Sequence, residues 1–168
     1  MQKINRKEKK RLAIIFGIIL FIGLLVIGCS MFIDEAKDVV NQYAYGMKSS
    51  NAQKIVNLYK EDMIYESYGS KKEMIQDYED MFNVLKEEHY IVESYEIDDK
   101  YKVYKGDELK KQVDSLVDYY GIEKNTIDEI RMYTVHFKCN DDGEKKNTKQ
   151  DVIVAKIDNH WYYIGTEE

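Results

Sequence analysis

The chain has 168 residues, a net charge of −6 and no proline. Residues 1–11 carry six basic side chains and one acidic side chain, which leaves −11 for the remainder. Nucleic acid is bound by basic faces, so it is excluded as the expected partner of so acidic a domain. The two cysteines and three histidines show no metal-ligand spacing, so we expect no disulfide scaffold, no metal and no cofactor.

The pattern of residues 1–33 predicts a membrane-targeting or membrane-anchoring segment. Six basic residues are followed by an apolar stretch, and no charged residue occurs between Arg11 and Asp34. A basic flank stays on the cytoplasmic side, so residues 34–168 are expected outside the cytoplasm, at the cell membrane of a Gram-positive-type bacterium. The chain is therefore divided into a segment 1–33 and one exported domain 34–168, which has the usual size of a single domain.

Two interpretations of the first segment remain open. Val26-Ile27-Gly28-Cys29 resembles the bacterial lipobox, in which the cysteine receives a diacylglyceryl group and the preceding peptide is removed. The resemblance implies that Cys29 is the lipidation site of a lipoprotein, and acyl chains give stable anchoring. Alternatively, the uncharged residues 12–33 are long enough to remain as an uncleaved transmembrane helix.

The exported domain begins with helical patterns. Apolar residues at helical spacing predict a helix over 34–48, and Ser50 to Gln53 reads as a capping box that opens a short second helix. Ser70 to Glu73 reads as another capping box, opening a third helix that ends near residue 88. A further helix is expected over 107–120, started by Gly106-Asp107 and ended by Gly121.

The remaining segments predict strands. Residues 90–104 are rich in β-formers, with an irregularity at Asp98-Asp99, and 130–139 alternate with one apolar face. Asn140 to Gly143 is expected to turn the chain into a polar hairpin tip that reaches residue 149. Strands over 150–157 and 160–164 follow, joined at Asp158-Asn159. Helices followed by antiparallel strands predict the α+β class.

This order resembles the nuclear transport factor 2-like (cystatin-like, SnoaL-like) superfamily, in which N-terminal helices pack into the hollow of a curved antiparallel sheet. Two patterns carry the resemblance: Val39-Val40 to Tyr59 at the start, and Val152 to Ile164 at the end. The family's last hairpin often has glycine where Asn159 stands here. The helix over 107–120 departs from the minimal fold, and we expect it to cover or reshape the mouth of the family's pocket.

Five aromatic residues are candidates for the pocket or the core: Tyr43, Phe82, Tyr133, Phe137 and Trp161. No catalytic residue is assigned. His136 falls on the face opposite Tyr133 in a regular strand, so these two residues are not expected to share a site.

We expect a membrane-anchored extracytoplasmic binding or interaction domain, a non-enzymatic lipoprotein whose partners are the membrane and an unidentified protein or small-molecule ligand. Two alternatives stay open. The first is a structural subunit of a cell-envelope or conjugation/type IV secretion assembly with one membrane helix. The second is a small-molecule enzyme that uses the cone pocket. Fold resemblance is the only basis for both alternatives.

Overall fold

In the part of the chain that the structure describes, four helices precede the first strand, and the last three strands follow one another. A computed structural model describes residues 34–167, and those from Glu35 onward belong to one compact unit. The described chain is α+β, as predicted, with five α-helices packed against a four-stranded antiparallel sheet. The elements are α2 (Glu35–Lys48), α3 (Ala52–Val56), α4 (Glu61–Tyr68), α5 (Lys71–Glu87), β1 (Tyr90–Val103), α6 (Gly106–Tyr120), a 3-10 turn η1 (Lys124–Thr126), β2 (Ile127–Asp141), β3 (Glu144–Ile157) and β4 (His160–Glu167).

The predictions for residues 1–33, including the lipobox and the membrane segment, lie outside the described residues. Among the helices of residues 34–167, none combines the length and the apolar character that crossing a bilayer requires.

The strands lie in the order β1-β2-β3-β4, and two tight turns join the last three. Asp142-Gly143 and Asp158-Asn159 both have positive φ at each residue, as two-residue turns between twisted strands require. The turn predicted at Asp158-Asn159 is confirmed, and the one predicted over Asn140 to Gly143 is confirmed at Asp142-Gly143 only, because Asn140 and Asp141 belong to β2. The predicted polar tip up to residue 149 is wrong, because β3 starts at Glu144 and pairs with Asp141 directly. After a two-residue turn, backbone hydrogen bonding between the two strands begins at once, and it does not depend on the polarity of the side chains.

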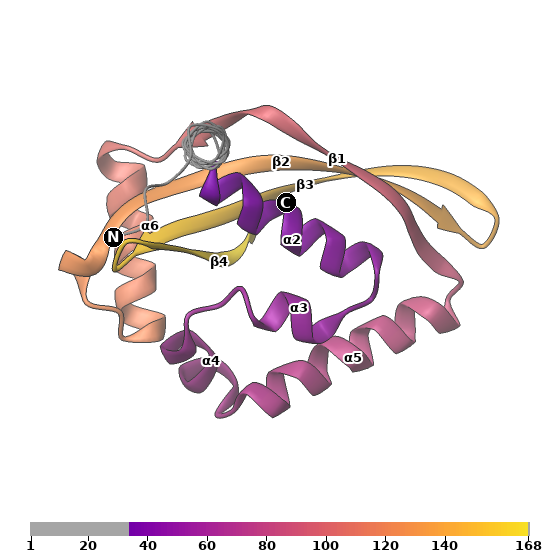
Figure 1. The fold of residues 1–168 in the computed structure, drawn as a ribbon, viewed down its shortest axis with the longest axis horizontal. Coiled ribbons are helices and arrows are strands. Elements are labelled where there is room, and N and C mark those ends of the chain that lie inside the picture. Colours follow the sequence, from indigo (N-terminus) through magenta and orange to yellow (C-terminus); the bar gives the residue numbers. More distant parts are fainter. Residues whose placement is uncertain (1–33, 168) are drawn as a thin grey trace, which may run out of the picture. The chain divides into compact units, whose positions relative to one another are not determined.

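The two faces of the sheet carry different helices (Figure 1). The inner face, defined by Tyr133, Val135 and Phe137, packs against α2, and the predicted alternation of this strand is confirmed. The outer face, defined by Ile130, Ile153 and Ala155, packs against Val113 and Leu116 of α6. These outer-face residues are also buried, so the sheet is covered on both sides at this end.

The helix α6 therefore does not lie where the sequence suggested. We expected it to cover or reshape the mouth of the family's pocket, but its buried side chains pack on the outer face of the sheet. It begins at Gly106 after Lys105, which makes no side-chain cap bond, so capping by Gly106-Asp107 is wrong. The predicted end is confirmed, because Gly121 caps the helix in the left-handed conformation.

Other helix starts agree with the sequence in part. Ser70 caps α5 as predicted and accepts a hydrogen bond from the Glu73 N–H. The cap of α3 is displaced by one residue, because Asn51 rather than Ser50 accepts the bond, from the Lys54 N–H. Helix α4 was missed, so the expected three helices before the first strand are four. Its eight residues bury only Met63 and Ile64, which is too few to show a helical period.

The predicted irregularity in β1 is confirmed. Its pairing with β2 shifts between Ile97 and Tyr101, around Asp98-Asp99, and again between Val92 and Ser94. Bulges bend a strand and increase its local twist. Asp99 at the larger bulge forms an ion pair with Lys37 of α2 at 2.8 Å, so the bulge also contacts the helix layer.

Helices α2 and α3 approach closely at Gly46. A Cβ at this position would lie 2.5 Å from Cγ1 of Ile55, a fully buried side chain. We predict that Gly46→Ala lowers the free energy of unfolding by about 1–2 kcal/mol, since overpacking outweighs the gain in helix propensity. Urea unfolding followed by circular dichroism measures this change.

A double-mutant cycle tests the cause of that loss. Ile55→Ala removes the side chain that the new Cβ would contact, so it should cost less in the Gly46→Ala background than in the wild type. Equal costs in both backgrounds would show that the contact at Gly46 is not close.

Candidate functional site

A pocket lies at the end of the inner face where the helix layer stops. With 14 residues α2 is about 21 Å long, whereas the 15 residues of β2 extend about 50 Å. The β2–β3 hairpin therefore extends past Lys48, and the inner face beyond Phe137 is not covered by α2. The C-terminal end of α5 and the first residues of β1 form the other wall. In Figure 1 these segments meet on the right-hand side.

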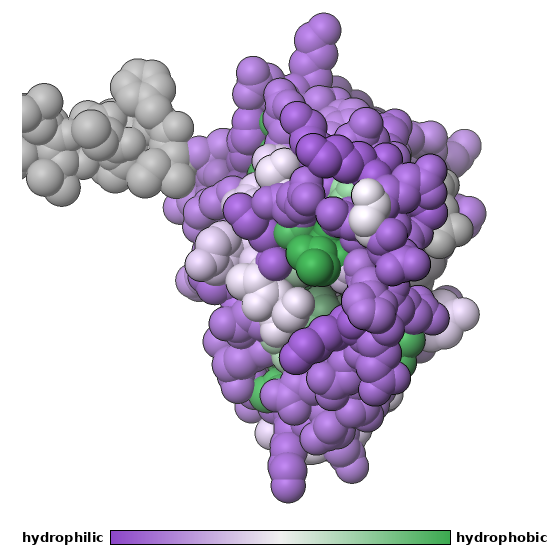
Figure 2. Space-filling model, turned by 90° about the vertical axis from the view of Figure 1, so that its right-hand side faces the viewer, coloured by the Kyte–Doolittle hydropathy of each residue, from purple (hydrophilic) through white to green (hydrophobic). Residues whose placement is uncertain are grey.

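The pocket has a volume of about 870 Å³, within the range of small-molecule sites. Six of its apolar lining residues are buried or half-buried, namely Met47, Phe82, Leu85, Val92, Phe137 and Cys139, whereas Ile91 is 60% exposed at the edge. Its charged lining residues are all exposed, so an apolar interior is surrounded by a polar rim. Figure 2 looks onto this side and shows a hydrophobic area amid hydrophilic side chains.

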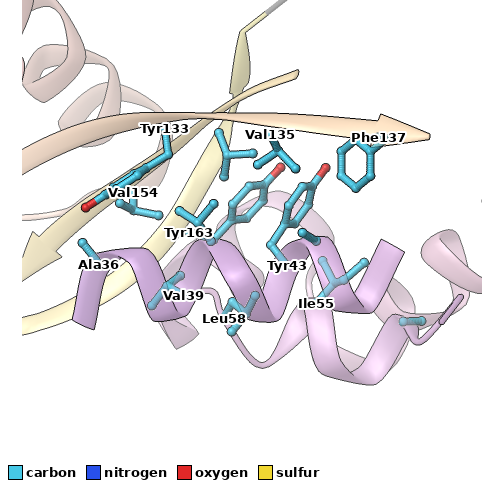
Figure 3. Close-up of a cluster of buried hydrophobic side chains, with 14 of the residues drawn as sticks. Ala36, Val39, Tyr43, Ile55, Leu58, Tyr133, Val135, Phe137, Val154 and Tyr163 are labelled. Carbon is cyan, nitrogen blue, oxygen red and sulfur yellow. The ribbon is translucent and has the colours of Figure 1, made fainter. Parts of the chain in front are cut away.

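A stack of tyrosines fixes α2 beside the pocket (Figure 3). The rings of Tyr43 and Tyr163 lie parallel, 4.5 Å apart, and Tyr59 packs edge-on against Tyr163 at 4.9 Å. The Tyr43 hydroxyl donates a hydrogen bond of 3.0 Å to Oε1 of Gln150, which lines the pocket. The stack therefore joins the helix, the sheet and the pocket wall.

Burial keeps these tyrosines neutral. Desolvation raises the pKa of Tyr43 to about 12. It also raises the pKa values of Tyr59 and Tyr163 well above the ordinary value for tyrosine. Groups that hold their protons this firmly do not exchange them near neutral pH, so the stack is structural.

Two charged lining residues direct their side chains away from the pocket. Glu167 accepts a hydrogen bond of 3.0 Å from Nε2 of Gln112 on α6. Lys149 lies 3.8 Å from Asp151, with which it shares the outer face in the alternation of β3. The charges left at the rim are those of Lys48, Lys86 and Glu79.

The five predicted aromatic residues do not form one site. Phe82 and Phe137 line the pocket, whereas Tyr43 belongs to the stack beside it. Tyr133 is fully buried under Tyr101, with ring centroids 5.0 Å apart. Trp161 is half-buried and packs against the same core, where it belongs to a cluster of charged and aromatic side chains.

That cluster is centred on Arg131. Its guanidinium lies 4.6 Å from the centre of the Trp161 ring and 4.7 Å from that of Tyr101. Nε and Nη2 donate to the two carboxylate oxygens of Glu129, at 2.8 and 3.2 Å, and this hydrogen bonding raises the pKa of Arg131. The charge is satisfied within the cluster, so we assign it a structural role.

The histidines do not assemble a site with these groups. His136 is exposed on the outer face, 3.2 Å from Asp98, while Tyr133 is buried on the inner face, which confirms the predicted separation. Within residues 34–167, no three His, Cys, Asp or Glu side chains are grouped as metal ligands.

The sequence did not indicate most of the pocket. Met47, Cys139 and Gln150 were not proposed as lining residues, although Cys139 follows Phe137 on the same face. The length of the β2–β3 hairpin would have indicated the pocket wall, because the full-length hairpin places Thr148 opposite Phe137. A scan against protein-family models finds no match for the chain, and a search of the curated proteins finds none either. Function is therefore proposed from the geometry and the sequence.

Tyr43 makes stability depend on alkaline pH. Below pH 10 this side chain is protonated in both the folded and the unfolded chain. Between pH 10 and about 12 only the unfolded chain releases the proton, so the free energy of unfolding falls, by about 2 kcal/mol in all. Urea unfolding at stepped pH should show a shallower fall for Tyr43→Phe, together with a loss of about 1 kcal/mol at neutral pH from the bond to Gln150.

Tyr119→Phe is the matched control, because Tyr119 is 77% exposed. This variant should reproduce the wild-type profile. If Tyr43→Phe also reproduces it, Tyr43 ionises freely in the folded protein and the stack is not the tight contact described.

Proposed function

We propose that the chain is a membrane-anchored, extracytoplasmic binding domain, a non-enzymatic lipoprotein that takes an apolar ligand into the inner-face pocket. The observation that carries the proposal is the pocket itself, an apolar hollow with a polar rim. It lies at the C-terminal end of α2, about 21 Å along the helix from the residue that follows the N-terminal segment. The ligand is therefore expected to enter away from the point where the chain leaves that segment.

The fold proposed is that of the nuclear transport factor 2-like superfamily. This assignment is supported by α2, α3 and α5, which pack on one face of an antiparallel sheet and leave a hollow beside α2. The outer-face position of α6 leaves the pocket open, which supports binding there.

A binding role is favoured over catalysis by the chemistry of the lining. The interior consists of Met, Leu, Val, Phe and Cys side chains, and the described lining includes two carboxylates, Glu79 and Glu167. Both are exposed, and Glu167 bonds to α6. No Asp, Glu, His, Lys or Arg is buried within residues 34–167, whereas an acid or base with a strongly shifted pKa usually owes it to burial.

A pocket-filling substitution tests the binding site. Thr148 is an exposed lining residue on the inner face, directly opposite Phe137. We predict that Thr148→Trp places an indole in the hollow and weakens binding of the neutral fluorophore N-phenylnaphthylamine about tenfold or more. The measurement is a fluorescence titration of the full chain in phosphatidylcholine nanodiscs.

Asn147→Trp is the control, because residue 147 is adjacent and points to the outer face. Both variants carry the same new indole and the same anchor, so uptake of the fluorophore by lipid cancels between them. Asn147→Trp should bind as the wild type does. Equal binding by both variants would place the fluorophore elsewhere and overturn the pocket as the ligand site.

The membrane attachment is tested by intact mass of the membrane-extracted chain. We predict that the wild type and Cys139→Ala lack residues 1–28 and carry a diacylglyceryl group, whereas Cys29→Ala is full-length and unmodified. Cys139 is buried in the domain, so its variant controls for loss of a thiol. Full-length, unmodified protein in all three would contradict the lipoprotein proposal. It would favour the membrane-helix subunit of an envelope assembly.

A further inference from the structure

We propose that the pocket selects an amphiphile with one alkyl chain and an anionic head group, of which an alkyl carboxylate is the simplest form. The inference rests on the proposed binding function and specifies its ligand class. The apolar lining is assigned to the alkyl chain of the ligand, and two rim lysines, Lys48 and Lys86, are assigned to its head group.

The alkyl chain of the ligand is assigned to the apolar lining because of the composition of that lining. Met47, Phe82, Val92 and Phe137 come from four different elements and surround one hollow of about 870 Å³. One of them is a methionine, whose unbranched, flexible side chain adapts to an alkyl chain. An alkyl chain transferred from water to such surroundings is stabilised in proportion to its buried area.

The head group is assigned to Lys48 and Lys86 because their charges remain available. Six lysines of the described chain lie within 4 Å of a carboxylate: Lys37, Lys60, Lys102, Lys124, Lys146 and Lys149. Among residues 34–167, neither Lys48 nor Lys86 has such a partner. Both side chains stand at helix ends on the pocket rim.

The acidic residue of the rim, Glu79, lies apart from the basic residue Lys86. Glu79 and Lys86 are seven residues apart on α5, which places them on one helix face about 10 Å apart along the axis. An anion held at Lys86 is therefore about two turns from the rim carboxylate. The remainder of the chain after residue 11 has a charge of −11, so anions are not attracted to the domain as a whole.

The experiment measures binding of alkyl compounds to the full chain in phosphatidylcholine nanodiscs by equilibrium dialysis, with empty nanodiscs as the blank. Hexanoate, octanoate, decanoate and dodecanoate form the chain-length series at pH 8. Affinity should rise about fourfold for each added methylene until the hollow is filled. Decanol and decylammonium form the head-group series, and decanoate should bind most tightly.

The variants separate the head group from the chain. Lys48→Glu/Lys86→Glu should weaken decanoate binding about tenfold and leave decanol binding unchanged, so decanol reports that the pocket is intact. Lys110→Glu/Lys111→Glu on α6 is the matched control, because it changes the net charge equally at exposed positions outside the pocket. This control should bind both compounds as the wild type does.

Each contrary result has a distinct meaning. Equal binding of decanoate, decanol and decylammonium by the wild type would overturn the anionic class and leave the apolar binding site standing. A loss of decanoate binding in the Lys110→Glu/Lys111→Glu control as large as in the rim variant would also overturn the role of Lys48 and Lys86. Failure of every compound to bind would overturn the ligand class together with the proposed function.

Discussion

The difference in length between α2 and the β2–β3 hairpin is the constraint on which the rest of the structure depends. The tyrosine stack holds α2 against the inner face, and the 4.5 Å contact between Tyr43 and Tyr163 fixes where the helix lies. From that position a helix of about 21 Å covers only part of strands about 50 Å long. The uncovered part of the inner face, walled by α5 and the start of β1, becomes the pocket.

The same arrangement explains why the pocket favours binding over catalysis. The tyrosines beside it are desolvated, which raises their pKa values, so they keep their protons near neutral pH. The charged groups near the hollow remain at its exposed rim, where water surrounds them. The site therefore offers a ligand apolar surface to be buried against and the charges of a few rim side chains. These are the two features that recognition of an amphiphile requires.

The sequence predicted the parts of the fold that depend on local patterns. The alternation of 133, 135 and 137, the turns at Asp142-Gly143 and Asp158-Asn159, and the cap at Ser70 follow from short-range chemistry and are confirmed. The polar start of β3 was missed because backbone pairing with β2, not side-chain polarity, keeps it in the sheet. To predict the pocket, both the true length of the hairpin and the position of the end of α2 would have been needed. Phe82 and Phe137 were proposed, but the sequence could not show that they line the same pocket.

Locating a bound amphiphile tests the central claim, that the ligand lies in the hollow beyond the end of α2. Decanoic acid bearing a diazirine is photolysed with the full chain in phosphatidylcholine nanodiscs, with and without excess decanoate, and the adducts are mapped by peptide mass spectrometry. The account predicts adducts that decanoate suppresses on the peptides holding Lys86 to Val92 and Phe137 to Cys139. Suppressible adducts confined to α6 and the outer face, with none on these peptides, would contradict it.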